Sequence, residues 1–214
     1  KISKADLTGA NLTSAKLMGA DLTGANLTGT TLTSADFSDT DQTTDVVTAA
    51  NLTSAILTSA DLSGQDLTSV DFEKADLSGA NLQSADLENA ILTGAKLITS
   101  GGTNFVNLTG AILTGAKLSK ADLTGADLGA NPAGTATNLV GADLTGAILI
   151  DVDLSDAILV NDTVGSKGAN LEKADLTDAD LGNTVFSVTH DTTDVVTAVN
   201  LTSAILTGAD LNGQ

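Results

Sequence analysis

One imidazole and a few groups of carboxylates are the side chains whose types could do chemistry in this sequence. His190 is the only His, the chain contains no Cys, and no Ser-His-Asp spacing surrounds it. A single His cannot supply a multi-His zinc site. Its counterpart in a similar earlier segment is Asp41 or Gln42, so the imidazole is not a constant feature of that segment. We interpret His190 as an exposed loop residue.

Carboxylates gather at three places along the chain and suggest calcium binding or acid–base catalysis. None of the groups matches an EF-hand loop or the Gly-rich nonapeptide of calcium β-rolls. Acid–base catalysis also needs a cleft that positions the carboxylates around a substrate. We therefore favour a solvated acidic surface over a metal site, and we expect neither a bound metal nor enzyme activity. The groups are Asp36, Asp39, Asp41 and Asp45; Asp151, Asp153 and Asp156; and Asp191 and Asp194.

The overall charge excludes several classes of protein. Twenty-seven acidic residues face nine basic ones, all Lys, which gives a formal net charge of −18. Because a phosphate-binding surface needs positive charge, direct nucleic-acid binding is not expected. No stretch approaches 18 consecutive apolar residues, so membrane insertion is not expected either. The compartment is undetermined, although the composition favours a secreted or cell-surface protein over a cytoplasmic one.

A period of five residues dominates the sequence. Leu or Phe recurs at every fifth position over long stretches, as in ADLTG ANLTS AKLMG from Ala5. Five residues turn 500° in an α-helix, so the Leu side chains would spiral around its axis. The period instead predicts a short strand followed by a corner, with Leu and the Ala two residues before it pointing inward. Gly at a corner allows a positive φ in a type II turn, and corners with Ser, Asp or Lys are expected to turn in another way.

These residues resemble the pentapeptide-repeat family, whose pattern is A(D/N)LXX, over nearly the whole chain. The resemblance implies an all-β fold, a right-handed quadrilateral β-helix with one pentapeptide on each side and about twenty residues per coil. Residues 1–214 would form a single solenoid of about ten coils, roughly 48 Å long. Its interior would be filled by Leu and Ala, leaving no room for a cofactor.

The repeat is interrupted at five places, near 38–50, 98–107, 129–138, 161–170 and 187–199. We interpret them as loops or bulges, because they contain Gly or Pro turn signals or lose the repeat pattern. The interruptions near 98–107, 129–138 and 161–170 are expected to hold one pentapeptide plus one, one and two extra residues. In addition, residues 43–65 nearly repeat as 192–214, an offset of 149. We expect the sequence to be a fragment of a longer repeat protein.

Ile replaces the outward Asp or Asn in several pentapeptides. If the interruption at 98–107 holds one pentapeptide, Ile91 and Ile112 stack on adjacent coils of one face and form a candidate interaction strip. The same count places Lys16, Lys96 and Lys117 on one face. Isolated exposed Ile residues are common, however, and need no function.

Three functions are compatible with a rigid acidic rod. We favour a structural spacer or protein-interaction module of a larger protein, whose partner is a protein, flanking repeats of the same chain, or another copy bound end to end. The alternative, implied by the family resemblance, is DNA mimicry that targets a type II topoisomerase such as DNA gyrase. One net charge per about 2.7 Å of rod is less dense than the one per about 1.7 Å of B-DNA. Ice binding by rows of outward Thr is the third.

Overall fold

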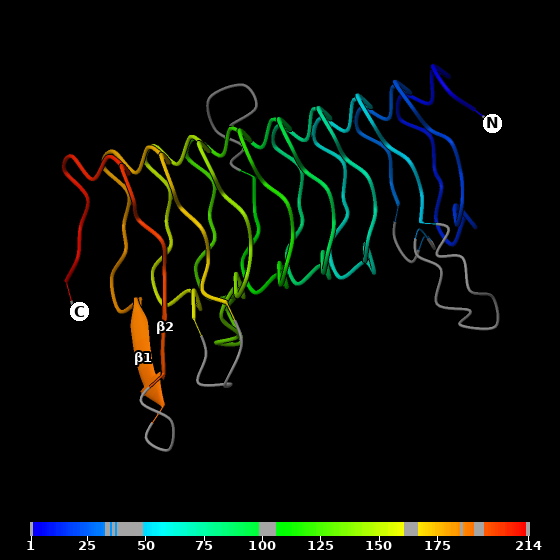
Figure 1. Cartoon of the computed structure of the whole chain (residues 1–214). Coiled ribbons are helices and arrows are strands. Elements are labelled where there is room, and N and C mark those ends of the chain that lie inside the picture. The colour runs from blue at the N-terminus through cyan, green and yellow to red at the C-terminus, as the bar shows by residue number, and fades with distance from the viewer. Residues whose placement is uncertain are drawn as a thin grey trace.

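The computed structural model shows a four-sided solenoid in which the chain winds as a rod from the N-terminus to the C-terminus (Figure 1). It describes residues 2–32, 35, 37, 49–98, 106–160, 167–184, 186–190 and 195–212. On each side of a coil, one residue forms a parallel β-bridge with the coil before it and with the coil after it. The predicted β-helix is confirmed. These ranges contain no helix with the length and hydropathy needed to cross a lipid bilayer.

Four columns of bridged residues define the four faces of the rod, which we number in chain order. Faces 1 and 2 each contain nine bridged positions among the described residues, so the expectation of about ten coils is not confirmed. Face 2 lies opposite face 4. Face 1 contains Asp6, Asn26, Ile56, Asp76, Lys96, Asp122, Ile148, Asp175 and Ile205; face 2 contains Asn11, Thr31, Asp61, Asn81, Asn107, Asp127, Asp153, Asp180 and Asp210; face 3 contains Asp66, Asp86, Ile112, Asn138 and Ile158; face 4 contains Asp21, Asn51, Asp71, Ile91, Lys117, Asp143, Asn170 and Asn200.

The interior is filled by the residues that the period of five points inward. Central Leu side chains such as Leu57 and Leu123 and inward Ala side chains such as Ala55 are fully buried. Thr takes the inward Ala position at Thr30 and Thr184, where each hydroxyl donates a hydrogen bond to the carbonyl of the central Leu three residues earlier. At roughly 2 kcal/mol per buried Leu, four sides give on the order of 8 kcal/mol per coil before entropy is subtracted.

Among the described residues, the corners that lead directly into the next pentapeptide turn in the same way, whichever residue occupies them. Gly29 has a φ of +62°, and the non-Gly corners Ser54, Lys74, Asn89 and Asp156 have φ values between 56° and 59°. In each type of corner the next residue donates a backbone hydrogen bond to the central Leu or Phe, as Ala55 does to Leu52 at 2.9 Å. The expectation that Ser, Asp or Lys corners turn differently is therefore wrong. The cross-coil hydrogen bond of the corner N–H, such as Ser54 N to Glu73 O at 2.8 Å, offsets the left-handed strain.

Insertions leave the rod between adjacent faces and add more residues than expected. Lys96 and Asn107 lie on faces 1 and 2, eleven residues apart where five would suffice, so six residues leave the coil. Asp127 and Asn138, on the adjacent faces 2 and 3, are likewise eleven residues apart. The expectation of a stacked pentapeptide plus one residue is therefore wrong, because the bridged residues on either side of each insertion lie on adjacent faces.

This register also places the two residues of the candidate interaction strip on different faces. Ile91 is bridged to Lys117 on face 4, whereas Ile112 lies on face 3 between Asp86 and Asn138. The predicted stacking of Ile91 on Ile112 is wrong for the same reason. Lys96 and Lys117 are likewise on different faces, 1 and 4.

Two insertions have a described conformation of their own. Near 187–199, β1 (Ser187–His190) and β2 (Val195–Ala198) pair antiparallel and project away from the coils (Figure 1), so a hairpin replaces the expected loop. At 129–137, Thr137 is fully buried, and its hydroxyl accepts from Gly110 N at 2.9 Å and lies 2.9 Å from the carbonyls of Leu108 and Gly129. Of the expected interruptions near 38–50, 98–107 and 161–170, residues 38–48, 99–105 and 161–166 lie outside the described residues.

Replacing Gly29 with Ala isolates the strain of the corner conformation. A Cβ at Gly29 would meet no atom within 4 Å, so the only cost is its φ of +62°. We expect Gly29→Ala to lower the free energy of unfolding by about 1 kcal/mol, measured by denaturant titration. The reverse change Ser54→Gly should raise stability or leave it unchanged. Equal stability of Gly29→Ala and the wild type would show that the corner carries no strain.

Candidate functional site

The outward Asp or Asn of each pentapeptide is part of the backbone hydrogen bonding. Its Oδ1 accepts the N–H of the residue two positions later, as Asp6 does from Thr8 at 3.1 Å and Asn51 from Thr53 at 2.9 Å. Many of the Thr and Ser hydroxyls that follow donate to the same oxygen, for example Thr124 Oγ1 to Asp122 Oδ1 at 2.7 Å. The preference for Asp or Asn therefore has a structural cause, which the sequence analysis missed.

Face 2 is the most uniformly acidic side of the rod. Asp127, Asp153, Asp180 and Asp210 follow one another on successive coils, about 4.8 Å apart, and Asp61 lies nearer the N-terminus. Asp156 adds a sixth carboxylate at a corner of this face. The pentapeptides of face 2 contain no Lys at any described position. We call these six residues the Asp face.

The stacking within the Asp face affects the ionisation of Asp127. Partial burial holds the pKa of this carboxyl above its ordinary value of 3.8, although Gly129 N donates a hydrogen bond to it at 3.1 Å. The negative charge of Asp153 on the next coil raises the pKa further. Ionised Asp127 therefore carries an energetic cost, which a cation bound at this face would reduce.

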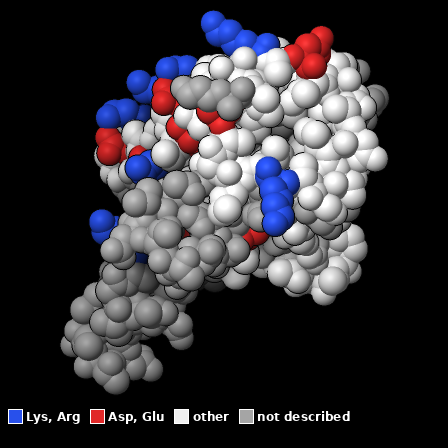
Figure 2. All heavy atoms as spheres, turned by 90° about the vertical axis from the view of Figure 1, so that its right-hand side faces the viewer, with Lys and Arg blue, Asp and Glu red and all other residues white. Residues whose placement is uncertain are grey.

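Face 4 has the opposite character. It contains five of the Lys residues: Lys4, Lys74, Lys117, Lys120 and Lys173. Lys74 and Lys173 form ion pairs with the preceding Glu73 and Glu172 at 2.7 and 2.6 Å. Figure 2, which looks along the rod from its N-terminal end, shows Lys side chains gathered toward one side with carboxylates beside several of them.

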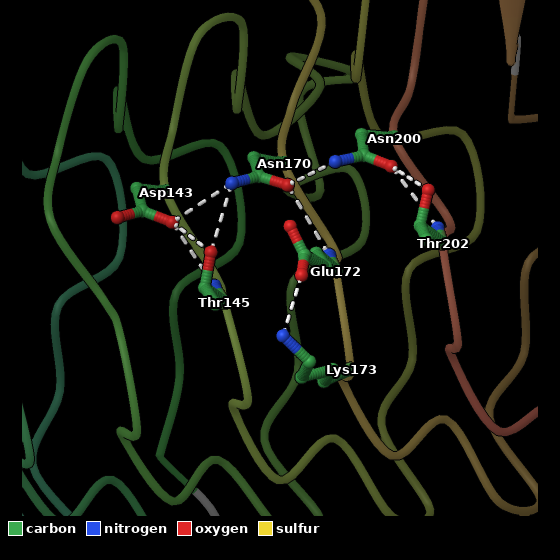
Figure 3. A network of polar contacts seen from close by, with 7 residues as sticks. All are labelled: Asp143, Thr145, Asn170, Glu172, Lys173, Asn200 and Thr202. Atoms are coloured by element: carbon green, nitrogen blue, oxygen red, sulfur yellow. Dashed lines mark hydrogen bonds and ion pairs between the residues drawn. The ribbon is translucent and has the colours of Figure 1, made fainter.

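Polar side chains also link successive coils along face 4 (Figure 3). Asn200 Nδ2 donates to Asn170 Oδ1 at 2.9 Å, and Asn170 Nδ2 donates to Thr145 Oγ1 at 2.8 Å. Burial tends to raise the pKa of Asp143, but hydrogen bonds from Thr145, Ser119 and Asn170 outweigh it, so the pKa is lowered. Carboxylates occur on both faces as hydrogen-bond acceptors, but on face 4 they alternate with Asn and Lys and two Glu form ion pairs with Lys, whereas four Asp of the Asp face are stacked on successive coils.

The other residues singled out by the sequence do not converge on a site. Asp153 and Asp156 lie on face 2, while Asp151 occupies the preceding corner. His190 ends β1. Across the described part of the chain, no three His, Asp or Glu residues come together in a way that could hold a metal ion. The acidic groups at 36–45 and at 191 and 194 lie outside the described residues.

Comparison with known proteins identifies the repeat. The sequence profile of pentapeptide repeats matches eight copies, at residues 3–41, 48–83, 73–98, 104–129, 135–161 and 167–187. The chain belongs to the pentapeptide-repeat family. No curated protein sequence matches it significantly.

Two solved pentapeptide-repeat structures show the extent of the similarity. HetL, a protein involved in heterocyst differentiation regulation from the cyanobacterium Nostoc sp. strain PCC 7120, is 33% identical with a TM-score of 0.63; the match covers 99% of this chain and 89% of HetL. Trypsin-treated QnrB1, a plasmid-mediated fluoroquinolone resistance protein, is 20% identical with a TM-score of 0.46 over 98% and 88% of the two chains. The second similarity concerns the fold alone.

Substitutions at Asp153 separate its structural role from its charge. Its Oδ1 accepts hydrogen bonds from Ser155 N at 2.9 Å and Ser155 Oγ at 2.6 Å. We expect Asp153→Ala to lower the free energy of unfolding by about 1 kcal/mol, because both bonds are lost, and Asp153→Asn to stay within about 0.5 kcal/mol of the wild type. Denaturant titration at neutral pH measures both. Equal losses in the two variants would contradict the role of Oδ1 as an acceptor.

Asp127 and Asp143 should respond to pH with opposite signs. Because the folded-state pKa of Asp127 is raised, its ionisation costs stability above that pKa, and the cost disappears as the pH falls to 3.8. Asp127→Asn should therefore be more stable than the wild type at pH 7, with a difference that shrinks in acid. Asp143, whose pKa is lowered, contributes stability above 3.8 that is lost as the pH falls through its folded-state pKa.

Asp143→Asn is the matched control and should be less stable than the wild type at pH 7. Free energies of unfolding measured from pH 7 to pH 3 test both variants. Curves that run parallel to that of the wild type would exclude any difference between the two carboxyl groups.

Proposed function

We propose that the chain is a non-enzymatic, rigid acidic solenoid that acts as a structural spacer and protein-interaction module, with the Asp face binding a cationic protein partner. The observation that carries this proposal is the separation of charge. Among the described residues, face 2 presents six Asp and no Lys, while the opposite face 4 contains five Lys, two of which form ion pairs with Glu. A stacked row of carboxylates on one side attracts a positively charged surface and orients the rod against it.

The solenoid supports such a role, because its backbone hydrogen bonds hold the Asp side chains in fixed positions. Each Oδ1 of Asp127, Asp153 and Asp180 accepts a backbone hydrogen bond, at 3.1, 2.9 and 2.8 Å. The bridges from coil to coil repeat the same spacing along the face. Little side-chain entropy then remains to be lost on binding, which favours recognition of a partner with matching spacing.

The relationship to HetL favours the same class of function. HetL is involved in heterocyst differentiation regulation, and a binding role for the present chain is compatible with that. The interior of the present chain is filled with side chains such as Leu82 and Phe72 that have no exposed surface. A filled rod offers surfaces for binding rather than a cavity for a substrate.

The two other functions are less well supported. The Asp face has one carboxylate per about 4.8 Å of rod, whereas a DNA strand has one phosphate per about 3.4 Å of helix axis, so mimicry of DNA rests on overall acidity alone. For ice binding, outward Thr hydroxyls would have to be free. Those of Thr8, Thr28 and Thr177 instead donate to the neighbouring Asp or Asn at 2.6 to 2.7 Å.

Neutralising three residues of the Asp face tests the proposal. The triple variant Asp127→Asn, Asp153→Asn and Asp180→Asn keeps an acceptor for each backbone N–H and removes three charges. We expect it to bind poly-L-lysine roughly tenfold more weakly than the wild type at low salt, measured by isothermal titration calorimetry. The matched control is Asp21→Asn, Asp71→Asn and Asp143→Asn on face 4, which makes the same change in net charge.

Equal weakening in both triple variants would overturn the proposal, because the effect would then follow net charge rather than the Asp face. A gyrase supercoiling assay separates the main proposal from the alternative. Inhibition by the wild type that the face 2 variant loses would identify gyrase as the cationic partner. No inhibition at tens of micromolar chain would mean that the cationic partner is a protein other than gyrase.

A further inference from the structure

The corner between faces 4 and 1 has Lys on alternate coils through the middle of the rod. The corner residues there are, in order along the rod, Lys74, Gly94, Lys120, Gly146 and Lys173, because the face 4 residues that precede them are bridged from coil to coil. All three Lys residues are exposed, and they recur at intervals of about 9.6 Å, which is two rises of the coil. We call Lys74, Lys120 and Lys173 the Lys row.

Backbone hydrogen bonds hold the Lys row at these intervals. The N–H of Lys74 donates to Thr93 O at 3.0 Å, and the N–H groups of Lys120 and Lys173 donate to the equivalent carbonyls at 3.1 and 2.9 Å. A Cβ on Gly94 would meet Lys74 Cγ at 3.7 Å, so the stem of this Lys lies over the Gly corner of the next coil. The ammonium groups are therefore attached at fixed spacing along one edge of the rod.

The rod itself neutralises the Lys row only in part. Lys74 and Lys173 form ion pairs with Glu73 and Glu172, but the Lys side chains are 68% and 65% exposed, so solvent screens these pairs and they stabilise the fold little. Lys120 is not preceded by Glu and forms no ion pair with any described residue. Because its own ion pairs are weak or absent, the row can bind carboxylates of another molecule at little cost.

Each Lys of the row lies within one turn of the coil of an Asp on the Asp face. One Lys is thirteen residues from its Asp and the other two are seven residues from theirs, whereas bridged residues on successive coils are twenty or more positions apart. The members of a pair therefore differ in level along the rod by less than one rise of about 4.8 Å. They lie on opposite sides of one molecule and cannot reach each other there. The pairs are Asp61 with Lys74, Lys120 with Asp127, and Lys173 with Asp180.

We infer that a second copy of this chain is the cationic partner of the Asp face, with the two rods side by side, parallel and in register. The same rod fits because one coil rise spaces both the Asp face and the Lys row, so all three Lys meet an Asp without any change of shape. Since faces 2 and 4 are opposite, each docked copy keeps one free Asp face or one free Lys row. The contact is heterologous and continues as a ribbon of rods. This inference rests on the proposed function, because it names the partner of the Asp face.

The net charge of −18 limits the strength of this contact and determines how it depends on salt. At physiological ionic strength, charges more than about 8 Å apart are largely screened, whereas a Lys and an Asp in contact still attract each other. The repulsion between two acidic rods is therefore reduced more than the attraction at their contact. Each exposed ion pair contributes little, so the association is weak and is lost when about 1 M salt screens the pairs as well.

Sedimentation velocity of the 1–214 chain, from about 1 μM to about 1 mM in about 0.15 M salt, tests this association. We expect the weight-average sedimentation coefficient to rise with concentration, and the rise to disappear in about 1 M salt. Replacing all three Lys of the row by Gln should keep the chain monomeric. The matched control Lys16→Gln, Lys96→Gln and Lys167→Gln makes the same change in net charge outside face 4 and should associate like the wild type. A monomeric wild type at all concentrations, or equal effects of the two triple variants, would overturn the inference.

Mixing two complementary variants tests the arrangement of the rods. The variant without the Lys row keeps the Asp face, and the triple variant Asp127→Asn, Asp153→Asn and Asp180→Asn keeps the Lys row. Each alone should be monomeric, whereas an equimolar mixture at about 1 mM should form heterodimers that grow no further, because each copy has one docking surface left. A mixture that stays monomeric would contradict the inference.

Poly-L-lysine binding by the variant without the Lys row separates this inference from the proposed function. This variant should bind poly-L-lysine at least as tightly as the wild type does, because its Asp face is intact. Normal poly-L-lysine binding by a wild type that never associates would overturn only the choice of a second copy as the partner.

Discussion

Most five-residue steps have one backbone N–H that pairs neither with the neighbouring coils nor with the corner turn. The outward residue pairs it wherever that residue is Asp or Asn, whereas steps with Ile56 or Lys96 at this position offer no such acceptor. In the step from Ala5 to Gly9, Leu7 N and Gly9 N donate to the next coil at 2.8 and 2.9 Å, and Ala10 N closes the corner on Leu7 O. Thr8 N instead donates its hydrogen bond to the side chain of Asp6, at Oδ1, over 3.1 Å. Because an unpaired N–H is costly where it is half-buried, this hydrogen bond favours Asp or Asn at the outward position without requiring either.

The constraint explains why acidity alone says little about function in this protein. Asn satisfies the same N–H as Asp, as Asn107 does for Thr109 at 3.0 Å, so the choice between the two residues is free for each coil. What is specific to this chain is which coils and faces have Asp rather than Asn at this position. Face 2 has Asp on four successive coils, while face 4 combines Asp and Asn with Lys. The distribution of charge over the faces, rather than its total, therefore carries the functional information.

Particular residues show how far the sequence could be interpreted. The inward Leu and Ala positions, including Leu92 and Ala90, are confirmed because the period of five fixes which side chains share a side. The stacking of Ile91 and Ile112 is wrong, because the length of an insertion does not reveal whether any of it rejoins the coil. The corners at Ser54 and Lys74 turn like Gly corners, because cross-coil hydrogen bonds override the local preference of these residues against a positive φ.

The sequence by itself determined the repeat of short strands and corners, the identity of the core and the near-identity of residues 43–65 and 192–214, while the four-sided coil followed from the resemblance to the pentapeptide-repeat family. These features depend on local periodicity and on composition, which are visible along one dimension. Only the tertiary structure decided which residues share a face, because every insertion shifts all later pentapeptides relative to the earlier ones. The Asp face and the Lys residues of face 4 both depend on that register, since contacts between coils join residues twenty to thirty positions apart.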